Sequence, residues 1–214
     1  MFEHKHIAAT IRILFKEQAA RRTLDVDDAL VGLARKIEED ERPGDTAVTL
    51  HRPANVDSPA TLAPLVSALT KISEELPLIL PAHPRAAASL RELITTDHIR
   101  LIPPAGYLDF VALEAGARIA LTDSAGVQEE TTMLGVPCMT LRDNTERPIT
   151  VTEGTNILAG RDPARIIEIA QQILTSPPAP RRPKLWDGHA GERIAEILLT
   201  GGTAQTRLRP TDLA

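Results

Sequence analysis

From residue 46 onward, short apolar runs alternate with longer segments in which apolar residues recur every three or four positions. Short runs rich in Val, Ile and Leu predict buried strands, and the longer spacing predicts amphipathic helices. The predicted strands cover residues 46–50, 76–80, 99–102, 119–122 and 136–141. The predicted helices cover residues 59–75, 87–94, 108–117, 127–134, 162–174 and 191–199.

Strands that alternate with helices predict an α/β fold, in which a parallel sheet is covered by helices on both faces. Ligands of such sheets bind beyond the carboxyl ends of the strands. A polar motif follows each of the five predicted strands at this edge. The motifs are His51-Arg52, His83, Gly106 to Phe110, Asp123 to Gly126 and Arg142 to Arg147. Their convergence predicts a single binding pocket.

The stretch TDSAGVQEE, residues 122–130, joins a predicted strand to a predicted helix through small residues. Small residues let a ligand approach the backbone, and first-turn N–H groups have no partner within the helix, so the junction suits a phosphate. An ordinary alternative stays open. Asp123 or Ser124 can cap the helix, with Glu129 and Glu130 as solvated carboxylates that the helix dipole favours.

Composition excludes several classes of function. A net charge of −5 argues against a broad nucleic-acid surface. Cys138 is the only cysteine of the 214 residues, so no internal disulfide forms and we expect a buried structural thiol. His4 and His6 lack further metal ligands nearby, and we expect no metal site and no cofactor. The N-terminus lacks the features of a signal peptide, and no apolar run reaches the roughly 18 residues of a membrane helix. We therefore expect a cytoplasmic protein without a membrane partner.

The chain divides into three predicted parts. Residues 1–45 form a helical N-terminal segment with helices at 7–18 and 26–37, broken by polar stretches. Residues 46–200 form the α/β domain, and residues 201–214 form a loose tail.

Several motifs, in order along residues 49–194, carry a resemblance to a known family. They are TLHRPANVD, AHPR, GYLDF, TDSAGVQEETTMLGVPCMTLRDNTERP, EGTN and LWDGHAGERI. With these motifs the chain resembles the carboxyl-terminal half of the non-hydrolysing UDP-N-acetylglucosamine 2-epimerases. The resemblance implies the nucleotide-binding lobe of a two-lobed glycosyltransferase-type fold, and a place in cell-envelope polysaccharide biosynthesis.

The resemblance also implies a role for individual residues. Ser124, Ala125 and Gly126 would donate hydrogen bonds to the diphosphate, and Glu130 would accept them from the ribose hydroxyls. Phe110 would lie by the uracil, and Arg147 and His51 would face the phosphates and the sugar. The implied substrate-binding set is His51, Arg52, His83, Phe110, Ser124, Ala125, Gly126, Glu130 and Arg147, with His51 as the catalytic candidate.

Structural roles remain open for three of these residues. His51 can be a hydrogen-bonded loop histidine, and His83 can serve the fold. Arg147 can pair with Glu146 or Asp143 at the surface, an interaction worth about 0–1 kcal/mol.

The chain departs from the family at three short positions. Pro53-Ala54 replaces Arg-Glu in the HRPAN segment, Ala125 replaces a glycine, and Ala105 replaces a glutamine. These changes affect local contacts while leaving the predicted pocket in place.

Two family motifs of the amino-terminal lobe, Gly-Thr-Arg-Pro-Glu and His-x-Glu-Ala-Gly-x-Arg, do not occur in the 214 residues. In the family, UDP is eliminated and then added back to a 2-acetamidoglucal, and the acidic groups lie in that lobe. We therefore expect an epimerase-like protein that binds a UDP-sugar for interconversion of UDP-GlcNAc and UDP-ManNAc. Its other lobe would come from a partner or another chain, and a homo-oligomer is the alternative expectation for its partner. The alternatives are a non-catalytic UDP-binding or relic domain, and half of a sugar-nucleotide glycosyltransferase.

Overall fold

The structure is a computed structural model that describes residues 46–199. The helices predicted at 7–18 and 26–37 and the predicted tail at 201–214 lie outside the described residues. The chain divides into two compact units between Arg182 and Pro183. The described parts of these units are residues 46–182 and 183–199, and each is described by itself.

The first unit contains six parallel strands in the order β3-β2-β1-β4-β5-β6. Their bounds are β1 Thr46–Thr49, β2 Leu78–Pro81, β3 Ile99–Ile102, β4 Ala120–Thr122, β5 Cys138–Thr140 and β6 Asn156–Leu158. The order runs outward from β1 in one direction and from β4 in the other, so the sheet has its topological switch point between these two strands. Doubly wound sheets bind their ligands at this point.

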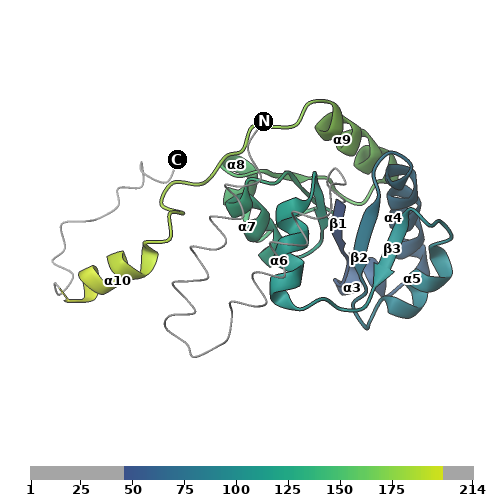
Figure 1. Cartoon of the computed structure of the whole chain (residues 1–214), viewed down its shortest axis with the longest axis horizontal. Coiled ribbons are helices and arrows are strands. Elements are labelled where there is room, and N and C mark those ends of the chain that lie inside the picture. The colour runs from purple at the N-terminus through teal and green to yellow at the C-terminus, as the bar shows by residue number, and fades with distance from the viewer. Residues whose placement is uncertain (1–45, 200–214) are drawn as a thin grey trace. The chain divides into compact units, whose positions relative to one another are not determined.

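Helices cover both faces of the sheet (Figure 1). One face carries α4 (Pro59–Ser73), α5 (Ala87–Leu93) and α9 (Pro163–Thr175), and the other carries α6 (Tyr107–Gly116) and α7 (Ala125–Leu134). Neighbouring residues of β1 serve the two faces in turn, because side chains alternate along a strand. Val48 joins the main core with the α4 and α9 leucines and isoleucines, whereas Ala47 packs with Ala117 and Val136 on the α6 and α7 side.

The five strands and six helices predicted from hydrophobic spacing are present, with boundaries shifted by a few residues. Three short elements were not predicted: α3 (Pro53–Val56), α8 (Pro148–Thr152) and the sixth strand, β6. Each has only three to five residues, which is too short to carry a periodic pattern. Both short helices begin with proline, whose fixed φ suits the first helical position.

Cys138 lies in β5, between β4 and β6, and is fully buried, which confirms the predicted structural thiol. Burial is the main cause that raises the pKa of this thiol to about 12. Within residues 46–199, no helix is long and apolar enough to cross a membrane.

The second unit contains α10 (Ala190–Leu199). Just before the helix, Asp187 forms an ion pair with Arg193, and His189 Nδ1 lies 2.7 Å from Glu192 Oε2. Large apolar side chains are exposed on this segment. They are Leu185, Ile194, Ile197, Leu198 and Leu199.

Candidate functional site

The site is built where β1 and β4 end side by side at the switch point. Thr49 and Thr122 are register partners on these strands, and their hydroxyl oxygens lie 2.6 Å apart. The next residues along the two strands lead to His51 and Asp123. The fold therefore brings together two motifs that are separated by 72 positions in the sequence.

Asp123 is fully buried and holds the β1 loop in place. Its carboxylate accepts hydrogen bonds from the backbone N–H groups of His51 at 3.1 Å and Arg52 at 2.9 Å, and from Asn55 Nδ2 at 3.1 Å. Burial by itself would raise the pKa of Asp123. The hydrogen bonds from the His51 side chain and the two backbone N–H groups outweigh burial and hold the pKa below its usual value. Asp123 is thus an ionised anchor rather than a helix cap.

The His51 ring is oriented by Asp123. Its Nδ1 lies 3.0 Å from Asp123 Oδ1, which leaves Nε2 as the ring nitrogen that can contact a ligand. The side chain is 37% exposed, so the ring is accessible. The His83 ring lies beside it, with centroids 5.9 Å apart, and His83 Nδ1 accepts a hydrogen bond from the Arg85 N–H at 3.3 Å.

The amino terminus of α7 is open to solvent. Ser124 is the N-cap residue, yet its hydroxyl accepts no capping hydrogen bond. The N–H groups of the first turn therefore do not donate to the Ser124 side chain. Gly126 is exposed, and a Cβ there would meet only the Ser124 hydroxyl, at an ordinary 3.8 Å. The protein's own packing does not require glycine at this position, so its lack of a side chain leaves room for a ligand against the backbone.

The adjacent carboxylates of Glu129 and Glu130 point to different neighbours, as expected for residues about 100° apart on a helix. Glu129 Oε1 lies 2.6 Å from Arg147 Nε. This pair corrects the alternative in which Arg147 joins Glu146 or Asp143, because the turn before α8 aims the Arg147 side chain at α7. Glu130 instead faces α6, where burial first and then the Glu130 charge raise the pKa of Tyr107.

Glu114 of α6 also faces Glu130. It is fully buried, and no well-directed hydrogen bond from the described residues satisfies its oxygens. Burial, followed by the Glu130 charge, raises its pKa to about 9, so Glu114 holds its proton at neutral pH. Glu130 consequently has a neutral acid beside it and not a second carboxylate.

A third cluster lies after β5. Arg142 donates two hydrogen bonds to the Glu146 carboxylate, at 2.6 and 2.8 Å, and Arg52 Nη2 approaches the same carboxylate at 3.6 Å. The hydrogen bond from Arg142 is the main cause that lowers the pKa of Glu146 to about 2. Glu146 thereby joins the loops that follow β1 and β5, two strands on either side of β4.

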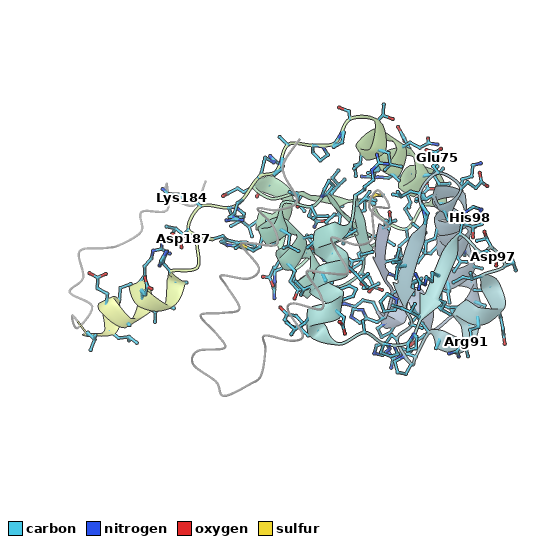
Figure 2. The ribbon with its side chains drawn as sticks, in the orientation of Figure 1. Glu75, Arg91, Asp97, His98, Lys184 and Asp187 are labelled. Atoms are coloured by element: carbon cyan, nitrogen blue, oxygen red, sulfur yellow. The ribbon has the colours of Figure 1, made fainter. Side chains whose placement is uncertain are left out.

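The structure places all the sequence-predicted site residues at the carboxyl edge of the sheet. His51 and Arg52 lie against Asp123, His83 lies beside the His51 ring, and Arg147 reaches α7 through Glu129. Ser124, Ala125 and Gly126 form the start of α7 and Glu130 lies one turn further along it, while Phe110 is half-buried on the first turn of α6. By contrast, Asp97 and His98 precede β3 and Glu75 precedes β2, at the opposite edge of the sheet, where Figure 2 shows them projecting outward.

Sequence reasoning missed the roles of Asn55, Glu114 and Tyr107, and it gave Asp123 a place in the pocket motif or a role as a helix cap without its role as the anchor of the His51 loop. Asn55 stands in the HRPAN motif and Tyr107 in GYLDF, so the motifs themselves were the available signal. The sequence around Glu114 carries no such signal, because a glutamate in an otherwise apolar helix indicates burial only when the packing is known.

Comparisons with known proteins agree with this geometry. The family described as UDP-N-acetylglucosamine 2-epimerase matches residues 17–199, which is most of the chain. The chain belongs to the UDP-N-acetylglucosamine 2-epimerase family.

Two curated relatives of this chain are named as 2-epimerases of different UDP-sugars. The UDP-N-acetylglucosamine 2-epimerase of Methanococcus maripaludis is 42% identical over 159 residues, which cover 71% of this chain and 43% of the relative. The UDP-2,3-diacetamido-2,3-dideoxy-D-glucuronate 2-epimerase of Pseudomonas aeruginosa is 38% identical over 151 residues, with 70% and 43% covered. The chain thus spans less than half the length of these relatives.

A solved structure gives the same result for the fold. The crystal structure of the Methanocaldococcus jannaschii UDP-GlcNAc 2-epimerase, in complex with UDP-GlcNAc and UDP, has a TM-score of 0.67 and 38% identity to this chain. The match covers 79% of this chain and 49% of that protein. The six-stranded parallel sheet is therefore the one found in half of a UDP-N-acetylglucosamine 2-epimerase.

Proposed function

We propose that this chain binds a UDP-sugar at the switch point of the sheet, as the nucleotide-binding half of a UDP-N-acetylglucosamine 2-epimerase. The observation that carries the proposal is the open amino terminus of α7, which has an uncapped first turn and an exposed Gly126. First-turn N–H groups and the helix dipole together favour a phosphate group. The site lies between His51 on one side and Arg147 on the other.

The proposal gives each part of UDP its own partners. The diphosphate lies on Ser124, Ala125 and Gly126, with the Arg147 guanidinium near its outer oxygens. Glu130, one turn beyond Gly126 on the same helical face, accepts hydrogen bonds from the ribose hydroxyls. Phe110, on the first turn of α6, packs against the uracil.

His51 is the proposed catalytic residue, with Arg52 and His83 beside it. Asp123 holds the Nδ1 side of the ring, so Nε2 is the atom available to the leaving phosphate oxygen when the bond between UDP and C1 of the sugar breaks. The groups that remove and return the C2 proton are proposed to come from residues outside this chain. They correspond to the part of the relatives' length that these 214 residues do not match.

Titration calorimetry with the full chain tests the binding proposal. We expect UDP to bind and ADP to bind much more weakly. The two ligands share the diphosphate and differ in the base, so the proposed contact between Phe110 and the uracil distinguishes them. His51→Gln weakens UDP binding, whereas His98→Gln, at the opposite edge of the sheet, leaves it unchanged. Equal binding of ADP and UDP, or no binding of UDP, would overturn the proposal.

A second assay separates binding from catalysis. The chain is incubated with UDP-GlcNAc in D₂O, and exchange at C2 is followed by NMR. We expect no exchange at an enzymatic rate, because the half-site lacks the opposing wall that would exclude water and position acid–base groups. Fast exchange by the pure chain would show that its own residues suffice for the proton transfer.

A further inference from the structure

Three polar residues from the sequence motifs have no role in the proposed site, yet they meet inside the first unit. They are Gln128 from TDSAGVQEE, Thr145 from DNTERP and Asn156 from EGTN. Gln128 and Asn156 are buried, with 0% and 3% of their surface exposed. Buried amides are costly unless hydrogen-bonded, so their partners indicate what they do.

Gln128 connects the start of α7 with the loop after β5. Its Nε2 donates to the backbone carbonyl of Ser124 at 3.0 Å. Its Oε1 accepts from the Thr145 hydroxyl at 2.5 Å and from Asn156 Nδ2 at 3.2 Å. One side chain thus contacts the residue before α7, the loop after β5 and the first residue of β6.

The same cluster holds the main chain of Arg147 on both sides. The Arg147 N–H donates to the Thr145 hydroxyl at 2.9 Å, and the Thr150 hydroxyl donates to the Arg147 carbonyl at 2.7 Å. Asn156 Nδ2 donates to the Thr150 hydroxyl at 3.1 Å. The backbone of Arg147 is therefore connected to Gln128 by two separate routes.

The direction of every hydrogen bond is fixed by chemistry. The carbonyls of Ser124 and Arg147 can only accept, so the Thr150 hydroxyl donates to Arg147 and takes its own hydrogen bond from Asn156 Nδ2. Gln128 must then accept with its oxygen and donate with its nitrogen to Ser124. A carboxylate at position 128 would place an oxygen against the Ser124 carbonyl, and an apolar side chain would leave several buried groups unpaired.

We propose that Gln128 is a positioning residue for phosphate binding, which fixes the Arg147 main chain relative to Ser124. This inference rests on the proposed function, because Ser124 and Arg147 are the two sides of the proposed diphosphate site. They follow different strands and share no direct hydrogen bond among the described contacts, and the buried cluster supplies the connection. Binding geometry has to be held within about 0.5 Å, and hydrogen-bonded supporting residues achieve this.

A purely structural role for Gln128 makes a different prediction. If the cluster only fills the interior, its loss weakens the binding of UDP and of uridine equally through lower stability, or it leaves the binding of both unchanged. If Gln128 positions the phosphate contacts, its loss affects the diphosphate and spares the nucleoside, because the uracil and ribose partners lie on α6 and at Glu130.

The test measures binding of UDP by calorimetry and of uridine by ligand-observed NMR, with the melting temperature recorded for each variant. Gln128→Met keeps the length of the side chain and removes its donor and acceptor. Thr145→Val is a milder, isosteric change that removes the hydroxyl linking Gln128 Oε1 to the Arg147 N–H, and it leaves the route through Asn156 and Thr150 in place. Gln172→Met, on the exposed side of α9, is the matched control.

We expect Gln128→Met to weaken UDP binding about tenfold and Thr145→Val to weaken it by a smaller factor, while uridine binding stays within about twofold. Equal losses for UDP and uridine, or no loss for UDP, would overturn the positioning role. If Gln128→Met fails to fold, Thr145→Val decides by the same comparison. If the wild-type chain binds neither ligand, the proposed function fails, and this inference fails with it.

Discussion

His51 Nδ1 lies 3.0 Å from Asp123 Oδ1, and the same carboxylate accepts the backbone N–H groups of His51 and Arg52. This contact ties the loop after β1 to the junction between β4 and α7. The carboxylate thus does two things at once: it fixes the shape of the loop, and it orients the ring of the proposed catalytic histidine.

Asp123→Asn is expected to lower the free energy of unfolding by about 1–3 kcal/mol, because the amide brings a donor against groups that are themselves donors. The wild-type contribution is present at pH above the usual aspartate value of 3.8 and is lost as pH falls through the lower pKa of the folded state. Urea denaturation at pH 7 measures the loss. Asp97→Asn, exposed at the opposite sheet edge (Figure 2), is the control and should stay within about 0.5 kcal/mol. Equal effects of the two changes would refute the anchoring role of Asp123.

Glu130→Gln is expected to weaken UDP binding by about 1.5–3 kcal/mol, at least tenfold, because a charged acceptor for the ribose hydroxyls is lost. Comparison of UDP with 2′-deoxy-UDP by calorimetry gives the sharper readout. Wild type should prefer UDP, and the variant should lose that preference.

Glu129→Gln is the matched control for Glu130. It breaks only a half-exposed ion pair with Arg147, which is worth about 0–1 kcal/mol. It should keep the preference for UDP over 2′-deoxy-UDP. If both variants lose this preference equally, Glu130 is not the ribose partner.

Glu114 should make stability fall as pH rises across the neutral range. The unfolded chain releases this proton near pH 4.5, whereas the folded chain keeps it up to about 9. The contribution is therefore complete below about pH 4.5 and is lost as pH rises to about 9, with a slope of at most about 1.4 kcal/mol per pH unit. Glu114→Gln, which stays neutral, should flatten the decline in urea denaturation between pH 5 and pH 8. Glu75→Gln at the surface should leave it intact, and an unchanged decline in Glu114→Gln would contradict this assignment.

Cys138 should be unreactive toward thiol reagents in the native state. The thiol is fully buried in β5, and its raised pKa keeps it protonated, whereas the thiolate is the reactive form. A chromogenic disulfide reagent should react with one thiol per chain in denaturant and with almost none in buffer. Rapid native reaction would show that β5 opens far more readily than its burial indicates.

Much of the sheet could be predicted because its signals are local. Helix α4 repeats apolar residues at Leu62, Leu65, Leu69 and Ile72, and each of these is buried in the structure. The strands before His51 and Asp123 are short runs of apolar and β-branched residues, and their polar ends marked the edge where the site lies. The short elements α8 and β6 lack such repeats, so they appear only when the rest of the sheet is in place.

The amino-acid sequence was sufficient to predict the order of strands and helices, the motifs at the strand ends and the family that these motifs resemble. These follow from hydrophobic spacing and residue type, which act over a few positions of the chain. The three-dimensional fold was needed to show that Asp123 anchors His51 and does not cap a helix, that Arg147 pairs with Glu129, and that Gln128 and Asn156 share one buried cluster. Each of these contacts joins residues from different elements or loops of the fold. Hydrogen bonds and ion pairs depend on distances of about 3 Å, and the fold sets such distances between residues far apart in the chain.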